Sequence, residues 1–376
     1  MCNGEIMKSN FWRFQLCGQD IDAQPFPFST HGVFFKLKWR QICYQRGEME
    51  AQEHWMIHLQ RVFYPTLAAI GIPSNVMSFV IFWRRKCMLS KSSTFYLMAI
   101  SIADTAVLVF IVVLELSVKY LTVEPFWSQE PWCSLRDIFT YGASNTSTWL
   151  VVAFTAERFL SITTYSLRKH MGIPHGTLWT ICIICALSHL LALPYYWAYV
   201  SMYSQDLQRW VCIYKPNATI QYTLTIVSMQ TIVSHILPFV IIGVLNGLTL
   251  RQISLINRVH IICTSGQKVT PLLRSRKRKS VVLLVTVSMT FVLLTITRSI
   301  TQIILRTKGW ALNRDDYSLS INVAADIGTM LSLSNAAINM YLYACTQTRF
   351  RQEVITCVKY SLRRCCLITN GPSGHK

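Results

Sequence analysis

In the stretch WLVVAFTAERF, residues 149–159, eight uncharged residues run directly into the adjacent charges Glu157 and Arg158, as at the end of a membrane helix. This stretch closes the third of seven apolar stretches that occupy most of the sequence. A helix that crosses a bilayer needs roughly 20 mostly apolar residues. The seven stretches that meet this requirement are 57–83, 94–118, 134–162, 177–198, 221–250, 281–305 and 319–345.

The composition agrees with a membrane protein. Hydrophobic residues make up 52% of the 376 positions and charged residues only 14%, whereas soluble domains carry about 25% charged residues. No polar linker interrupts the chain between Met56 and Cys345. We therefore expect an all-α membrane protein with a seven-transmembrane helix bundle at 57–345. Residues 1–56 are expected to be a disordered amino-terminal segment, and 346–376 a tail.

The distribution of charge predicts the orientation of the bundle. The net charge is +19, and basic residues gather in the loops on one side of the predicted membrane. Eight of them, and no acid, lie between the fifth and sixth stretches. Positive loops stay cytoplasmic, so the amino terminus is predicted outside and the carboxy terminus inside, in a multi-pass protein of the plasma membrane. These basic residues flank membrane helices without a folded domain to present them, which favours contact with the lipid bilayer over nucleic acid.

The predicted topology also points to covalent modifications. Cys133 and Cys212 both fall on the oxidising exterior, where a disulfide between them can form. Asn217 begins an Asn-Ala-Thr sequon on the same face, which predicts glycosylation. Cys365 and Cys366 follow the last stretch and two arginines. Palmitoylation of this pair is predicted, with two unmodified thiols as the alternative.

Several polar residues lie inside the predicted spans, where they are costly and indicate a function. They are Asn75, Asp104, Ser147, Asn335 and Asn339. We expect them to converge on a hydrated pocket around Asp104 that can bind a sodium ion. The alternative is a hydrogen-bond network that serves helix packing alone.

Glu157 and Arg158 lie where the third span reaches the cytoplasm. Arginines at helix ends often extend toward the interface without further function. The adjacent acid favours a switch, because Glu157 can hold Arg158 in one arrangement and a partner protein can bind Arg158 in another.

Taken in order, the landmarks of residues 57–366 resemble those of the rhodopsin-like (class A) G-protein-coupled receptors. Cys133 lies 25 residues before Arg158, which is the family's separation. The landmarks are Asn75, Asp104, Cys133, Glu157-Arg158-Phe159, Trp179, Cys212, Pro238, Asn339-Met340-Tyr341-Leu342-Tyr343 and Arg349-Phe350-Arg351. The last of these implies a short cytoplasmic amphipathic eighth helix.

Short stretches also resemble the orphan branch that contains G-protein-coupled receptor 139. They are Thr146-Ser147-Thr148-Trp149, Pro194-Tyr195-Tyr196-Trp197, Leu245-Asn246, Asp326-Ile327 and Ala337-Ile338-Asn339. This narrower resemblance implies an extracellular ligand that is amino-acid-like or a small peptide.

The resemblance implies roles for further residues. Glu157, Arg158, Asn339 and Tyr343 would form the switch that activates a heterotrimeric G protein when the sixth span moves outward. Thr140, Tyr141, Arg298 and Asp326 would contribute to the ligand pocket. Arg298 would bind a ligand carboxylate, pair with Asp326 or extend outward.

The chain departs from the family in its sixth span. Thr295-Ile296-Thr297 replaces the family's Trp-x-Pro, so the bulky switch residue and the proline kink are both missing. Lys277 stands where some relatives carry an acid that restrains the switch arginine, which leaves Glu157 as the main expected restraint on Arg158.

These departures keep alternatives open. A receptor-like protein that no longer signals, acting as a scaffold or a receptor dimer partner, is one. A secondary transporter is another, although the sequence shows neither an internal repeat nor paired helix breaks. An enzyme is not expected, because the sequence contains no metal-protease motif, nucleophile elbow or phosphate-binding loop.

Overall fold

The computed structural model describes residues 54–84, 89–117, 125–163, 174–205, 209–215, 220–263, 271–307 and 316–369. The chain divides into two units, Met1–His58 and Leu59–Lys376, and the second unit contains the helix bundle. The amino-terminal segment predicted for 1–56 lies almost wholly outside the described residues, and the predicted domain boundaries stay predictions.

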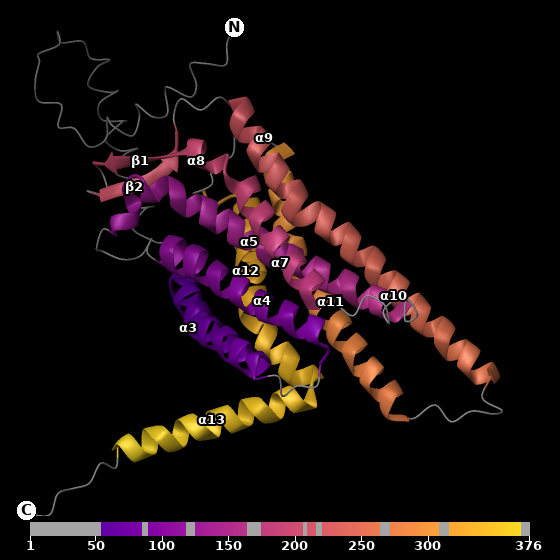
Figure 1. Cartoon of the computed structure of the whole chain (residues 1–376). Coiled ribbons are helices and arrows are strands. Elements are labelled where there is room, and N and C mark those ends of the chain that lie inside the picture. Colours follow the sequence, from indigo (N-terminus) through magenta and orange to yellow (C-terminus); the bar gives the residue numbers. More distant parts are fainter. Residues whose placement is uncertain are drawn as a thin grey trace, which may run out of the picture. The chain divides into compact units, whose positions relative to one another are not determined.

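Seven long helical segments lie where the sequence predicts spans (Figure 1). They are α3 (Trp55–Trp83), α4 (Lys91–Val107) with η1 (Leu108–Ser117), α5 (Trp132–Thr163), α7 (Pro174–Ala192), α9 (Ile220–Thr231) with η4 (Ile232–Ile236) and α10 (Leu237–Cys263), α11 (Pro271–Thr307) and α12 (Ser320–Thr346). Five of these segments are apolar enough to qualify as spans by length and composition alone. The remaining two, α5 and α12, each bury several polar side chains, which lower the hydropathy of the helix.

The fifth span shows how a local clash shapes a helix. Pro238 lies just inside α10, and the ring of a helical proline clashes with the carbonyl four residues earlier, here that of Ser234. The helix widens into the π-helical segment η4 at that point. Such π turns are frequent at functional sites, and η4 places Ser234 and His235 toward the interior described below.

A β-hairpin and a disulfide mark one end of the bundle. Strands β1 (Tyr199–Ser204) and β2 (Arg209–Tyr214) pair antiparallel, after the short helix α8 (Tyr195–Ala198) and beside the turn η3 (Phe126–Ser128). The predicted disulfide between Cys133 and Cys212 is confirmed, and it joins α5 to β2. The Glu130 Oε1 atom accepts a hydrogen bond from the Ser201 backbone N–H at 2.9 Å. This hairpin end was not predicted from the sequence.

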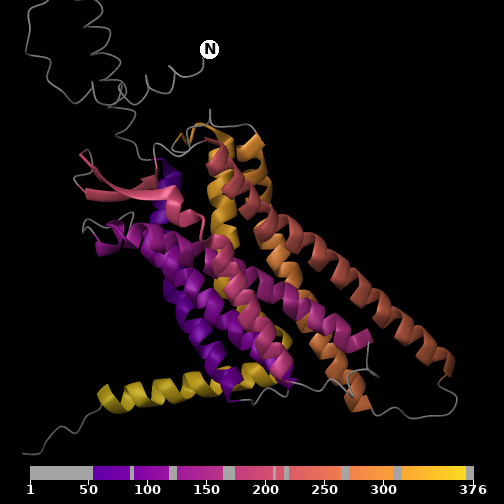
Figure 2. The same ribbon diagram turned by 45° about the horizontal axis from the view of Figure 1, so that its top comes forward.

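Helix α13 (Thr348–Thr369) marks the other end, where it crosses the direction of the bundle helices (Figures 1 and 2). Its first turn is anchored by Phe350, whose ring centroid lies 5.1 Å from that of Phe82 and 5.6 Å from that of Tyr343. Further along, Ile355 and Tyr360 are exposed. Exposed apolar side chains on a basic helix of this kind suit the surface of a membrane, as expected for the predicted eighth helix.

Glycines allow two pairs of helices to approach closely. A Cβ atom on Gly71 of α3 would lie 2.8 Å from the Cβ atom of Ala337 on α12. A Cβ atom on Gly328 of α12 would lie 2.7 Å from the backbone nitrogen of Arg298 on α11. Small residues at helix contacts are typical of membrane bundles, because they let two backbones pack against each other.

Gly328→Ala is therefore expected to destabilise the protein, because the new methyl group meets rigid backbone rather than a movable side chain. The loss should be about 1–3 kcal/mol, as for other overpacked interiors, measured as a lower thermal unfolding temperature in detergent. Gly247→Ala is the matched control, since a Cβ atom there has nothing within 4 Å. If Gly328→Ala and Gly247→Ala had the same unfolding temperature, this result would contradict the close contact between α12 and α11.

Candidate functional site

Asp104 is the centre of a hydrogen-bond network that joins three helices. Its Oδ1 atom accepts a hydrogen bond from Ser147 Oγ of α5 at 2.5 Å, and its Oδ2 atom accepts one from Asn339 Nδ2 of α12 at 2.6 Å. Asp104 itself is fully buried on α4. Two donors from different helices therefore satisfy both oxygens of one carboxyl group, and the structure brings together three of the polar residues that the sequence singles out.

Asn75 and Asn335 lie near this network in different roles. Asn75 Nδ2 donates to the backbone oxygen of Ala336 at 2.6 Å, so Asn75 binds the α12 backbone rather than Asp104. Asn335 is buried and lines a cavity between α5, η4, α11 and α12. The predicted polar cluster therefore has three parts in the structure. Ser147 and Asn339 bind Asp104, Asn75 binds the backbone of α12, and Asn335 lines the cavity.

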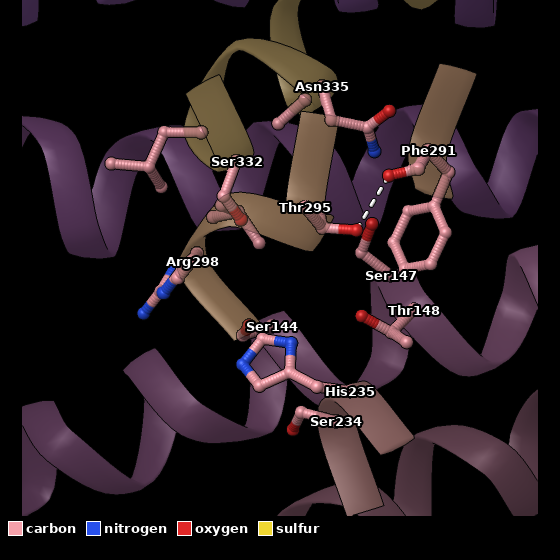
Figure 3. A pocket seen from close by; sticks show the side chains of 13 residues that line it. Ser144, Ser147, Thr148, Ser234, His235, Phe291, Thr295, Arg298, Ser332 and Asn335 are labelled. Atoms are coloured by element: carbon pink, nitrogen blue, oxygen red, sulfur yellow. Dashed lines mark hydrogen bonds between the residues drawn. The ribbon is translucent and has the colours of Figure 1, made fainter. Parts of the chain in front are cut away.

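The cavity that Asn335 lines is small and polar (Figure 3). Its volume is about 40 Å³, whereas one water molecule needs at least about 10–15 Å³. Drug-sized ligands occupy roughly 300–1,000 Å³, so this cavity suits a few water molecules or an ion and not a peptide. Its polar lining is formed by Ser144, Ser147, Thr148, Ser234, His235, Thr295, Arg298, Ser332 and Asn335.

Two side chains connect the cavity with the rest of the bundle. Ser147 lines the cavity and also donates to Asp104. Phe291 lines it from α11 and packs edge-to-face against Phe239 of α10, with ring centroids 6.1 Å apart. The Thr295 hydroxyl, at the position of the family's tryptophan, donates to the Phe291 backbone oxygen at 2.6 Å. A change in the cavity can therefore reach Asp104 on one side and the α10–α11 contact on the other.

Of the four residues predicted for the ligand pocket, Arg298 lines this cavity. Thr140 is buried, and the Tyr141 ring stacks on Tyr195 of α8 at 3.7 Å between centroids. Asp326 Oδ2 accepts hydrogen bonds from Gln60 Nε2 at 2.8 Å and from the Tyr317 hydroxyl at 2.7 Å. Thr140, Tyr141 and Asp326 lie nearer the hairpin end, and their binding role stays a prediction.

Arg158 lies at the α13 end of α5 and is almost completely buried. Its guanidinium group is ion-paired with Glu157, and its Nε atom donates to Glu157 Oε2 at 2.6 Å. Its Nη2 atom donates to Ser90 Oγ at 2.9 Å, and the guanidinium carbon lies 5.8 Å from the centroid of the Phe154 ring. The adjacent charges thus form the restrained pair that the sequence predicted, and Ser90 adds a contact from a second helix.

A partly buried amide pair between α5 and the fifth span was not predicted from the sequence. Asn145 and Gln230 exchange hydrogen bonds, with Gln230 Nε2 donating to Asn145 Oδ1 at 2.8 Å. The Ser234 hydroxyl donates to the same Asn145 oxygen. Asn145 lies in the middle of the apolar stretch 134–162. Its polarity inside a span was the signal that could have revealed this network.

A second missed contact joins α10 to α11. Asn246 Nδ2 donates to Ser288 Oγ at 2.8 Å, and both residues are buried. In the sequence Asn246 stands out only within the Leu245-Asn246 stretch, which offers no way to choose its partner.

Asn217 lies outside the described residues, so its predicted glycosylation is untested. Cys365 and Cys366 lie within α13, but their side chains are outside the described part of the structure. Palmitoylation of this pair stays a prediction.

Comparison with known proteins decides the family. The family model described as 7 transmembrane receptor (rhodopsin family) matches residues 74–343, which is well over half of the chain. The chain belongs to the rhodopsin family of seven-transmembrane receptors. The receptor is also 22% identical over 306 residues to galanin receptor 2a of Danio rerio, covering 80% of this chain and 78% of that relative.

The family match confirms several predictions from the sequence. The protein is a class A receptor, not an enzyme, and its fold is an all-α bundle that crosses the plasma membrane several times. The narrower resemblance to the orphan branch stays a prediction.

Asn339→Ala is expected to destabilise the receptor, because it removes one of the two donors to a fully buried carboxyl group. The cost should be about 1–2 kcal/mol, measured by thermal unfolding in detergent. Ser334→Ala on the same helix is the matched control, because the Ser334 hydroxyl donates to Met330 O within α12. Equal unfolding temperatures for the two variants would show that Asn339 contributes nothing through Asp104.

Proposed function

We propose that the receptor binds an extracellular small peptide or amino-acid-like ligand and activates a heterotrimeric G protein through outward movement of α11. The observation that supports this proposal is the burial of Arg158 together with its contacts to Glu157 and Ser90. A nearly fully buried guanidinium group is costly unless it is paired, and here a neighbouring acid and a serine hydroxyl hold it at the end of a helix. A group restrained in this way can be released to bind a partner.

The position of the ligand is inferred from the volume of the cavity, and its class from the relative. The cavity of about 40 Å³ is too small for a peptide, so the ligand would bind nearer the hairpin end, where Tyr141 and Asp326 lie. A relative named as a galanin receptor supports a ligand of the peptide class. In this proposal the hairpin end faces outside and the α13 end faces the cytoplasm, as the basic loops indicate.

Signalling would proceed as a shift between two arrangements of the bundle. A ligand can move this equilibrium only by its difference in affinity for the two states. Because Thr295 offers neither a bulky ring nor a kink, the change would pass through Phe291 to the α10–α11 contact and through Ser147 to Asp104 and Asn339. Tyr343, packed against Phe82 and Phe350, would rearrange with Arg158 to open a cleft for the G protein.

A second candidate is a receptor that no longer signals and acts as a scaffold or dimer partner. The observation that favours it is the short Thr295 side chain, whose hydroxyl bonds within its own helix and so cannot act as a bulky switch. The two candidates make opposite predictions for Arg158.

The test is G-protein activation in cells that display the receptor at verified surface levels, with aromatic amino acids and a small peptide library as ligands. Arg158→Ala should abolish the response, and any ligand-free signal, while surface expression is retained. Arg84→Ala, which changes an exposed arginine at the end of α3, should signal like the unchanged receptor. Silence of the unchanged receptor, with ligand-free signal equal to that of Arg158→Ala, would instead favour the scaffold.

We further propose that Asp104, Asn75 and Asn339 can hold a sodium ion. Among the residues that the structure describes, the buried Asn75 Oδ1 and Asn339 Oδ1 atoms have no hydrogen-bond partner. Oxygen atoms of this kind are the ligands that hard cations prefer. With the Asp104 carboxylate, they provide the negative and dipolar groups that a cation needs inside a membrane. A bound ion would stabilise the arrangement in which these helices are packed together.

Sodium chloride should therefore raise the unfolding temperature of the purified receptor above that in choline chloride at equal concentration, because a ligand that binds the folded state stabilises it. Asp104→Asn should lose this difference. Asp316→Asn, at an acid that the structure places outside the spanning helices, should keep it. A sodium effect of equal size in all three proteins would refute the site.

A further inference from the structure

Ser90 directly precedes α4 and caps that helix. Its backbone is extended, and its hydroxyl oxygen accepts a hydrogen bond from the Ser93 backbone N–H at 3.2 Å. The Ser90 and Ser93 hydroxyl oxygens lie 2.9 Å apart. Serine is a preferred residue at this position because it satisfies a backbone donor that the helix leaves unpaired. Capping alone would explain a serine here.

The same oxygen also binds Arg158. Arg158 Nη2 donates to Ser90 Oγ at 2.9 Å. A hydroxyl oxygen has two acceptor positions and one hydrogen. Accepting from Arg158 and from the Ser93 N–H fills both acceptor positions, and the hydrogen can then be donated to Ser93 Oγ. One hydroxyl group thus completes the cap of α4 and holds the guanidinium group of α5.

Glu157 and Ser90 restrain Arg158 differently. Glu157 is the neighbour of Arg158 in the chain, so the pair moves together with α5. Ser90 belongs to another helix, and its bond therefore resists displacement of the guanidinium group relative to α4. At the start of α11, where the family resemblance implies an acid in some relatives, the sequence of this chain has Lys277 and so offers Arg158 no carboxylate.

We propose that Ser90 is a positioning residue that holds Arg158 in the inactive arrangement, in place of an acid on α11. The inference rests on the proposed function, because it assigns Ser90 a part in the same switch. Activation must break the Ser90–Arg158 hydrogen bond before the guanidinium group can bind a partner. Ser90 therefore sets the population of the active state in the absence of ligand.

Two substitutions separate this role from capping. Glycine and aspartate are both accepted at the first position before a helix, glycine at little cost. Ser90→Gly keeps the cap position occupied by an accepted residue but removes the acceptor for Arg158. Ser90→Asp keeps a capping side chain and offers Arg158 a charged acceptor, which makes a stronger hydrogen bond. A restraint predicts changes in opposite directions, whereas capping alone predicts none or the same direction for both.

The experiment measures ligand-free G-protein activation at matched surface expression. Ser90→Gly should raise it by about tenfold, since a hydrogen bond to a charged group contributes roughly that factor to an equilibrium, and Ser90→Asp should lower it. Ser93→Ala is the matched control, because it removes a partner of Ser90 and leaves the acceptor for Arg158 intact. Changes in the same direction, or no change while Arg158→Ala still lowers the signal, would overturn the inference.

A thermal double-mutant cycle keeps the test independent of signalling. If Ser90 acts through Arg158, Ser90→Gly should lower the unfolding temperature in detergent, and this effect should largely disappear in the Arg158→Ala background. Equal effects in both backgrounds would overturn the inference even if the receptor signals. Coupling between the two residues in a receptor with no Arg158-dependent signal would uphold the contact and refute the proposed function instead.

Discussion

A carboxyl group held away from both water and lipid constrains the whole bundle. Asp104 lies inside α4, and its two oxygens are satisfied only because Ser147 and Asn339 reach it from α5 and α12. Burying such a group without donors would cost more than a typical hydrogen bond contributes. The positions of three helices are therefore coupled at one point, and the glycines at 71 and 328 allow the neighbouring backbones to come close enough.

The site is built outward from this point. Ser147 connects Asp104 to the small polar cavity, and Phe291 connects the cavity to the contact between α10 and α11. At the α13 end, aromatic packing of Phe82, Tyr343 and Phe350 fixes where α12 ends and α13 begins. Arg158 lies at the same end, between its neighbouring acid and a capping serine. A bundle of this design can change state through a few polar contacts without losing its apolar packing.

Much of the site was predictable, because polar residues inside apolar runs are conspicuous. Composition and order single out Asp104, Ser147, Asn339 and the Glu157–Arg158 pair. In the structure Ser147 and Asn339 contact Asp104, and Glu157 contacts Arg158. The Asn145–Gln230–Ser234 network was not predicted, although Asn145 is also a polar residue inside an apolar stretch. Ser90 could not have been found at all, since a serine at a helix start looks the same whether or not an arginine from another helix binds it.

The seven helices, the family and a candidate disulfide could all be predicted from the sequence, because apolar length, the order of landmarks and two exterior cysteines are properties of the chain. The tertiary structure decided the partners. Asn75 binds the α12 backbone, Asn335 lines the cavity, Tyr141 stacks on Tyr195, and Ser90 binds Arg158. Hydropathy says that a polar side chain must face the interior of the bundle, but only the packing of helices distant in sequence places one particular donor opposite one acceptor.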